Sequence, residues 1–269
     1  MKYSMMVLDL DGTVLNGESQ LEAATKTALL NSMKLGKKVV LCSSRSYQEM
    51  HKIIAQLYEG CRDQYCIGFG GACVYDLDGR CIIQSDPIPQ NAADHMIARA
   101  KACRIHIQGY DDSMLYYYDN TLEFRKFIRF ADVEDIPMQQ ISYEEFRNRS
   151  YLKLMCLGDI RKLEAYNALI AGDADTSFSN PAGQQGYLDI LRAGVSKGTG
   201  VAALCRYLHI PLEQCICVGD GDNDISMLRL AGLGAAMKNG SSAAKEAADY
   251  VLPYTNNEGA IPYLVERFF

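Results

Sequence analysis

Residues 4–13 read SMMVLDLDGT, an apolar run that ends in two aspartates, a glycine and a threonine. The short apolar part predicts a buried strand. Asp9 and Asp11 stand two residues apart, so on an extended segment their carboxylates point the same way, and Gly12 allows a tight turn. Carboxylates this close repel each other unless a cation or a shared proton relieves them. The stretch predicts a strand ending at a charged site, although a bare DxDG pattern also suits a simple acidic turn.

Outward from this stretch, short apolar runs alternate with amphipathic segments, a pattern that predicts a parallel sheet with strands buried on both faces. The predicted strands are residues 4–8, 38–42, 65–69 and 215–218, with short ones near Gly234 and Val251, and the predicted helices are residues 21–35, 47–58, 197–208 and 224–231.

The middle of the chain, about residues 84–185, has a different texture. It is richer in charged and aromatic residues and has shorter strand-like pieces, such as residues 114–118 and 151–157. This change predicts an α+β module inserted into an α/β core. We expect residues 1–84 and 186–269 to form the core, and residues 85–185 to form the insert.

The composition excludes several classes of protein. The 269 residues carry a net charge of −6, which gives no broad positive surface for nucleic acid or anionic membrane. Asp9 and Asp11 interrupt the first apolar run before a secretory or membrane-spanning segment could form. The ten cysteines contain no CxxC pair, and several lie in apolar runs, so we expect reduced thiols in the core rather than disulfides or zinc. We expect a cytoplasmic protein without nucleic-acid or membrane partners, a monomer or small homo-oligomer.

Three more segments place polar residues at or near a strand end. Ser43-Ser44-Arg45 follows the strand 38–42, where hydroxyl and N–H groups either grip phosphate or simply cap a helix. Lys197 opens a helix, where its charge opposes the helix dipole, which suggests an anion partner unless it is a solvated surface lysine. Residues 219–224, GDGDND, form an oxygen-rich cluster suited to a hard cation such as Mg²⁺. In a parallel sheet, ligands bind beyond the carboxyl ends of the strands, so we expect these segments to converge with Asp9.

DLDGT, the strand-end Ser43, the downstream Lys197 and GDGDND resemble, in order and spacing, the four motifs of the haloacid dehalogenase superfamily. The insert between the second and third motifs, together with GVSKGTG at residues 194–200, resembles the Cof-type subfamily of phosphatases. The resemblance implies a doubly wound parallel-sheet, Rossmann-like core with an inserted α+β cap domain that closes over the site and supplies specificity.

The resemblance also implies a role for each matched residue. Asp9 would be the nucleophile and Asp11 the general acid/base, and Lys197 would neutralise charge on both nucleophile and phosphoryl group. The phosphate contacts would be Leu10, Ser43, Ser44, Lys197 and Asn223. The Mg²⁺ ligands would be Asp9, Asp220 and the backbone carbonyl of Asp11, and Asp224 would support these ligands from behind. In the insert, Tyr116, Tyr117, Tyr118, Arg125 and Arg129 are candidate substrate contacts, although a run of tyrosines is also typical of a half-buried strand.

Two positions depart from the family pattern. Relatives often have Thr-Gly where this chain has Ser43-Ser44, a mild change because serine can make the same hydrogen bonds. They often have Asn-Gly-Ala where this chain has Gly70-Gly71-Ala72, which removes an amide near the expected cap hinge.

The sequence thus predicts a Mg²⁺-dependent phosphatase acting on a small phosphorylated metabolite, such as a sugar phosphate, through an aspartyl-phosphate intermediate. Two alternatives stay open. One is a phosphotransferase or phosphomutase on the same scaffold, and the other is a non-catalytic protein that binds a phosphometabolite.

Overall fold

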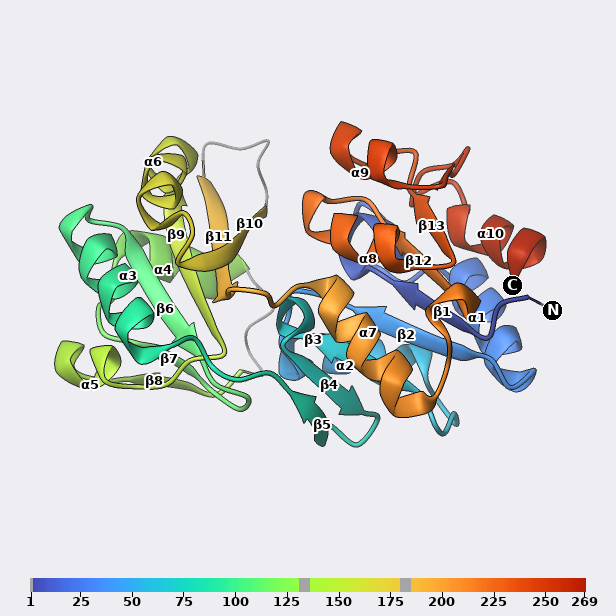
Figure 1. Cartoon of the computed structure of the whole chain (residues 1–269), viewed down its shortest axis with the longest axis horizontal. Coiled ribbons are helices and arrows are strands. Elements are labelled where there is room, and N and C mark those ends of the chain that lie inside the picture. Colours follow the sequence, from blue (N-terminus) through green and yellow to red (C-terminus); the bar gives the residue numbers. More distant parts are fainter. Residues whose placement is uncertain (1, 131–135, 180–184) are drawn as a thin grey trace. The chain divides into compact units, whose positions relative to one another are not determined.

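In the computed structural model of the chain, residues 2–130, 136–179 and 185–269 are described. The chain divides into two compact units (Figure 1). Met1–Gln84 and Ser196–Phe269 form the first, which we call the core unit, and Ser85–Val195 form the second, the insert unit.

The core unit contains an eight-stranded sheet in the order β14-β13-β12-β1-β2-β3-β4-β5. Its strands are β1 (Met5–Leu8), β2 (Lys38–Cys42), β3 (Tyr65–Gly68), β4 (Cys73–Asp76), β5 (Cys81–Gln84), β12 (Cys215–Gly219), β13 (Leu233–Ala236) and β14 (Tyr250–Val251). Its helices are α1 (Ala23–Lys34), α2 (Tyr47–Leu57), α7 (Lys197–Leu208), α8 (Ile225–Leu230), α9 (Ser242–Ala247) and α10 (Ala260–Phe268), with short helical turns η1 (Leu10–Val14), η2 (Phe69–Gly71), η3 (Leu212–Gln214) and η4 (Asp222–Asp224).

Strand β1 lies between β2 and β12 and is parallel to both. All four of its side chains are buried, as expected of a strand covered on both faces. Met5 and Val7 pack with Val201 of α7 and Met227 of α8, while α1, α2 and α10 lie on the other side of the sheet (Figure 1). The core unit is therefore a doubly wound α/β fold, as the sequence predicted.

The order of the strands reverses at β1. The chain passes from β1 to β2 on one side, and later returns to β12 on the other side. Such a switch point leaves a crevice at the carboxyl ends of the strands, which is where open α/β sheets bind their ligands.

The insert unit is a six-stranded sheet in the order β10-β11-β9-β6-β7-β8, antiparallel except for the pair β7 and β8. Its elements are β6 (His106–Tyr110), β7 (Leu115–Tyr117), β8 (Met138–Gln140), β9 (Lys153–Asp159), β10 (Ala174–Ser179), β11 (Gln185–Arg192), α3 (Gln90–Ala102), α4 (Leu122–Phe130), α5 (Tyr143–Arg147) and α6 (Ile160–Ile170). Alternate residues of its strands, such as Ile107, Leu154 and Ile190, form an apolar core with α3 and α6.

The second junction lies later than the sequence suggested. We expected the core to resume at residue 186, but β11 pairs with β9 and β10, so the insert unit runs through Val195. The sequence could not show this, because the unit to which a strand near a domain boundary belongs is set by the strands it pairs with.

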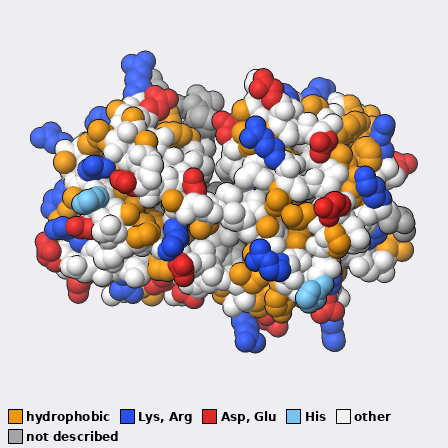
Figure 2. Space-filling model, viewed as in Figure 1, with side chains coloured by type: hydrophobic (Ala, Val, Ile, Leu, Met, Phe, Trp, Pro, Cys, Tyr) orange, Lys and Arg blue, Asp and Glu red, His pale blue; other side chains and the backbone are white. Residues whose placement is uncertain are grey.

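The remaining sequence-based expectations concern cysteines and charge. All ten cysteines are free thiols, and most are buried. On the face shown in Figure 2, acidic and basic side chains are interspersed over the described residues. No helix within the described ranges is long and apolar enough to cross a lipid bilayer.

Candidate active site

Three of the four predicted segments follow adjacent strands of the core sheet. Asp9 comes directly after β1, Ser43 after β2 and Asp220 after β12. Lys197, the fourth, is the first residue of α7, whose N-terminus is fixed by the capping residues Ser196 and Thr199. The fold therefore brings together segments that are up to about 200 residues apart in sequence, at the switch point.

Lys197 lies at the centre of the site. Its Nζ donates to Asp9 Oδ1 at 2.5 Å and to Asp224 Oδ1 at 2.5 Å. The side chains of Lys197 and Asp224 are almost fully buried, and that of Asp9 nearly so. A buried lysine bonded to two carboxylates excludes the solvated surface lysine that the sequence left open.

The second oxygen of Asp224 holds the turn that follows β12. Asp224 Oδ2 accepts from the backbone N–H of Asp220 and of Gly221, each at 2.9 Å. A Cβ at Gly219 would lie 2.4 Å from this oxygen, so glycine is required there. Both oxygens of Asp224 thus have protein partners, which fits a supporting carboxylate behind the site.

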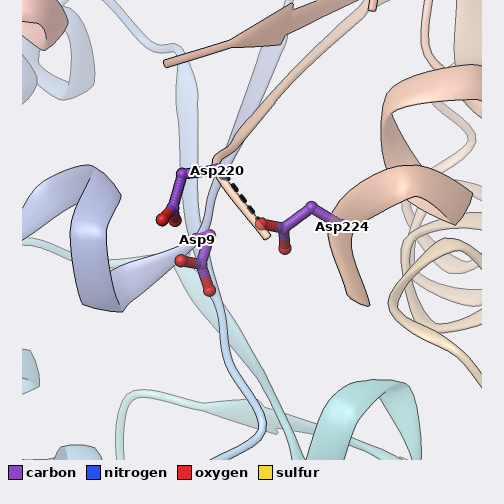
Figure 3. A group of neighbouring side chains, drawn as sticks. All are labelled: Asp9, Asp220 and Asp224. Atoms are coloured by element: carbon purple, nitrogen blue, oxygen red, sulfur yellow. Dashed lines mark hydrogen bonds between the residues drawn. The ribbon is translucent and has the colours of Figure 1, made fainter. Parts of the chain in front are cut away.

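Asp9, Asp220 and Asp224 form an acidic group whose carboxylate oxygens lie within 4.8 Å of one another. Figure 3 shows the three side chains side by side, with the bond from the Asp220 backbone to Asp224. With Lys197 as the one ammonium bonded to this group among the described residues, two negative charges remain uncompensated. Hard carboxylate oxygens in this number suit a cation such as Mg²⁺.

The protonation equilibria reflect this excess of negative charge. Burial, together with the charge of Asp224, raises the pKa of Asp9 well above its usual range, even though Lys197 acts to lower it. The same two causes raise the pKa of Asp220 to about 6. Burial acts to lower the pKa of Lys197, but the charges of Asp224 and Asp9 outweigh it and raise that pKa. The lysine therefore stays charged, while a further cation near Asp9 and Asp220 would act against both shifts and favour their ionised forms.

The Asp11 side chain lies outside this acidic group. Its carboxylate accepts two hydrogen bonds from Arg45, from Nε to Oδ2 at 2.9 Å and from Nη2 to Oδ1 at 2.6 Å. The backbone turns sharply after it, at Gly12 with φ +78°, and a Cβ on Gly12 would lie 2.4 Å from Asp220 Oδ2. Glycine at this position lets the backbone approach the acidic group closely.

The remaining predicted residues also lie in these loops. Leu10 and Ser43 are buried, and Ser43 Oγ accepts from the backbone N–H of Arg45 at 3.2 Å. Ser44 and Asn223 are half-buried, Ser44 before α2 and Asn223 within η4. The phosphate contacts assigned to all four stay predictions.

Three further residues take part in the site without having been assigned a role from sequence. Arg45 grips Asp11, Thr13 Oγ1 donates to Asp220 Oδ1 at 3.0 Å, and Asn239 Nδ2 donates to the carbonyl of Gly12 at 2.8 Å. Arg45 and Thr13 lie within the segments Ser43-Ser44-Arg45 and DLDGT that the sequence singles out, so their position was a usable signal. Asn239 lies far along the chain and gave none.

In the insert unit, the candidate tyrosines contribute to packing. Tyr116 donates to Asp111 Oδ2 at 2.9 Å with Arg149 over its ring, and Tyr118 packs on Phe146. The ring of Tyr117 contacts Phe124. Arg125 is exposed, and the side chain of Arg129 lies outside the described residues. A substrate contact by any of them stays a prediction.

Comparison with known proteins identifies the family. The sequence pattern of the haloacid dehalogenase-like hydrolases matches residues 6–264. The chain is 24% identical to the putative phosphatase YxeH of Bacillus subtilis over 98% of both chains, and 26% identical to the pyridoxal phosphate phosphatase YbhA of Escherichia coli over 94% of both.

Solved structures agree on the fold. The subclass IIB sugar phosphatase BT4131 superposes with a TM-score of 0.83 at 24% identity, covering 98% of each chain, and a haloacid dehalogenase-like hydrolase from Bacteroides thetaiotaomicron does so with a TM-score of 0.83 at 22% identity over the whole of both chains. The Cof-type resemblance carried by the four motifs is thus confirmed, and the chain belongs to the haloacid dehalogenase-like hydrolases.

Proposed function

We propose that this hydrolase is a Mg²⁺-dependent phosphatase that cleaves a small phosphomonoester through an aspartyl-phosphate on Asp9. The observation that carries the proposal is the buried arrangement of Asp9, Lys197, Asp220 and Asp224 at the switch point of the sheet. Attack on a phosphate dianion requires a nucleophile and positive charge beside it. Here the Asp9 carboxylate is the nucleophile, and the buried ammonium of Lys197 and a cation bound by the acidic group supply the positive charge.

The first half-reaction follows from the position of Asp9. A carboxylate oxygen of Asp9 attacks phosphorus, the bond from phosphorus to the ester oxygen breaks, and Asp11 gives the leaving oxygen its proton. Lys197, bonded to Asp9 at 2.5 Å, orients the nucleophile and offsets the charge that gathers around it.

The second half-reaction returns the enzyme to its starting state. Water attacks phosphorus of the aspartyl-phosphate, the bond from phosphorus to the Asp9 oxygen breaks, and Asp11 takes a proton from the water. This step frees the Asp9 carboxylate and releases inorganic phosphate, the alcohol having left in the first half-reaction. Ser43, Ser44, Leu10 and Asn223 are the proposed contacts to the phosphate oxygens.

The proposed ligands of Mg²⁺ are Asp9, Asp220 and the backbone carbonyl of Asp11. When bound, the ion offsets the excess negative charge and lets the phosphate dianion approach Asp9. Thr13 and Asp224 orient the ligands: Thr13 donates to Asp220, and Asp224 holds the Asp220 backbone.

A sugar phosphate or a comparable small metabolite is the proposed substrate class. It is supported by relatives and neighbours named as a pyridoxal phosphate phosphatase and a sugar phosphatase. We assign the specificity of the reaction to the insert unit.

A panel of phosphorylated metabolites, incubated with the protein and Mg²⁺ while phosphate release is followed, tests the proposal. We expect turnover of at least one sugar phosphate or similar ester, and none with Asp9→Asn, whose amide is nearly isosteric but a poor nucleophile. Transfer of phosphate to an added sugar in place of water would favour the phosphotransferase instead. Turnover by folded Asp9→Asn comparable with that of the wild type would refute the assignment of the nucleophile.

A further inference from the structure

We propose that Arg45 is a positioning residue, whose guanidinium holds the Asp11 carboxylate in the orientation from which it gives and takes the proton. This inference rests on the proposed function, in which Asp11 is the acid and base.

The contact between the Arg45 and Asp11 side chains is bidentate. Arg45 Nε donates to Asp11 Oδ2 at 2.9 Å and Nη2 donates to Oδ1 at 2.6 Å. Two parallel bonds fix both the direction of a carboxylate and its rotation about its own axis, which a single bond or a point charge does not.

Asp11 needs such a partner. Its side chain is 53% exposed, and among residues 2–130, 136–179 and 185–269 no other side chain donates a hydrogen bond to its carboxylate. An exposed aspartate otherwise samples several rotamers, whereas proton transfer requires placement to within about half an ångström. Each carboxylate oxygen has two lone pairs, so the one that Arg45 leaves open on each can still take a proton from water.

The backbone of Arg45 is itself anchored. Its N–H donates to Ser43 Oγ at 3.2 Å, and its carbonyl accepts from Phe69 N–H at 2.9 Å. The next residue, Ser46, caps α2 with a reciprocal bond to Glu49. Arg45 thus connects the strand-end loop that is expected to hold phosphate with the residue that is expected to move the proton.

Steady-state and burst kinetics of Arg45→Ala, Arg45→Lys, Asp11→Asn and the double variant Asp11→Asn/Arg45→Ala test the inference. The substrates are p-nitrophenyl phosphate, whose leaving group departs without a proton, and the best alkyl phosphate of the panel, whose leaving group requires one. Arg62→Ala, which removes an exposed arginine of the same unit, is the matched control.

We expect Arg45→Ala to lower kcat for the alkyl ester on the order of 10- to 100-fold, part of the total that acid–base catalysis supplies, with KM changed less than about threefold. With the aryl ester, a burst of nitrophenolate should persist and be followed by a slow steady state, because only hydrolysis of the aspartyl-phosphate still needs Asp11. Arg45→Lys should recover little of the lost kcat, since a lysine ammonium cannot donate the two parallel hydrogen bonds of a guanidinium. The double variant should be no slower than Asp11→Asn, because Arg45 acts through Asp11.

Other results would overturn the inference. A raised KM for both esters with loss of the burst would make Arg45 a phosphate ligand, and losses that multiply in the double variant would make it independent of Asp11. If Arg45→Lys recovers the full kcat, the positive charge of Arg45 would be its whole contribution. If Arg45→Ala behaves like Arg62→Ala, Arg45 would have no role in the reaction. A wild type without turnover would refute the proposed function itself, whereas an impaired Asp11→Asn beside an unimpaired Arg45→Ala would refute only the role of Arg45.

Discussion

Lys197 shows how strongly this site depends on charge balance. Taking an ammonium and two carboxylates out of water costs several kcal/mol per ion, and their mutual attraction offsets that cost only when the geometry is close. The two 2.5 Å contacts of Lys197 provide that geometry for Asp9 and Asp224. Asp220 shares the site, but among the described residues no ammonium is hydrogen-bonded to its carboxylate, and its pKa is raised to about 6.

Asp220 makes the stability of the metal-free protein depend on pH. Burial and the charge of Asp224 raise its pKa from 3.8 to about 6. A carboxyl whose pKa is higher in the folded than in the unfolded state contributes stability that is fully present below its unfolded pKa and is lost as pH rises through its folded pKa. Between pH 4 and pH 6, in the presence of EDTA, the free energy of unfolding should therefore fall by up to about 3 kcal/mol through this group.

Urea unfolding of wild type and Asp220→Asn at both ends of this range isolates the effect. Asparagine keeps an oxygen for the Thr13 hydroxyl but carries no charge. The variant should gain stability relative to wild type as pH rises. A difference between the two proteins that is the same at pH 4 and at pH 6 would contradict the role given to Asp220.

The sequence could predict which residues of the site converge, but not how each side chain points. Asp9 and Asp220 follow from the rule that ligands bind at strand ends, and Lys197 follows from the resemblance in the order of the motifs. The structure brings the three residues together. The Asp11 carboxylate points toward Arg45, a hydrogen-bond partner on another loop. A pattern of residue types carries no information on such a contact.

At the scale of elements, α7 is held against the β3–β4 connection at very short range. Gly71 in η2 has φ +108°, and a Cβ on it would lie 2.0 Å from the carbonyl oxygen of Ser196. Because Lys197 follows Ser196, this close approach of two backbones constrains the position of Lys197. The neighbouring Gly70 has φ +60°, an αL conformation that asparagine tolerates better than most other residues with a side chain.

Gly71→Ala and Gly70→Asn form a matched pair of substitutions. Gly71→Ala combines an unfavourable φ with a clash against backbone and should cost at least about 2 kcal/mol of unfolding free energy. Gly70→Asn should change it by less than about 1 kcal/mol. Phosphatase turnover should fall with Gly71→Ala because α7 must shift. Equal stability and equal activity of the two variants would show that the close approach does not position Lys197.

The helices and strands were predictable where the pattern of apolar residues is clear. The apolar runs that became β1, β2 and β3, and the periodic segments that became α2 and α7, were found within one or two residues of their ends. The antiparallel strands β4 and β5 were not predicted, and β11 was assigned to the wrong unit, because each is defined by a pairing partner rather than by its own residues.

At the scale of the whole molecule, the two units differ in what they contribute. The core unit contains every residue of the acidic group, while the insert unit has its own apolar core and connects to the core unit at residues 84–85 and 195–196. Binding of a cation should therefore stabilise the molecule through the core unit alone.

Thermal unfolding with and without Mg²⁺ measures this effect. A ligand present at 100 times its Kd adds about 2.7 kcal/mol to the stability of the state that binds it, so Mg²⁺ should raise Tm by several degrees and EDTA should reverse the shift. Asp220→Asn should show little response. Ca²⁺ should also stabilise the protein but inhibit turnover, because its looser coordination tolerates bidentate carboxylates. A wild-type Tm insensitive to Mg²⁺, or full turnover in excess EDTA, would contradict the proposed metal site.

The central claim is that Asp9 carries the phosphoryl group during turnover, and trapping that species tests it most directly. Protein is mixed with Mg²⁺ and p-nitrophenyl phosphate carrying a radiolabelled phosphate, quenched in acid within milliseconds, digested, and mapped by mass spectrometry. Asp11→Asn is included because it should still form the intermediate from this aryl ester but hydrolyse it slowly. The account predicts one labelled peptide, phosphorylated at Asp9, that is more abundant in Asp11→Asn than in wild type and absent from Asp9→Asn. Label on another residue, or phosphate release by an enzyme that never becomes labelled, would contradict it.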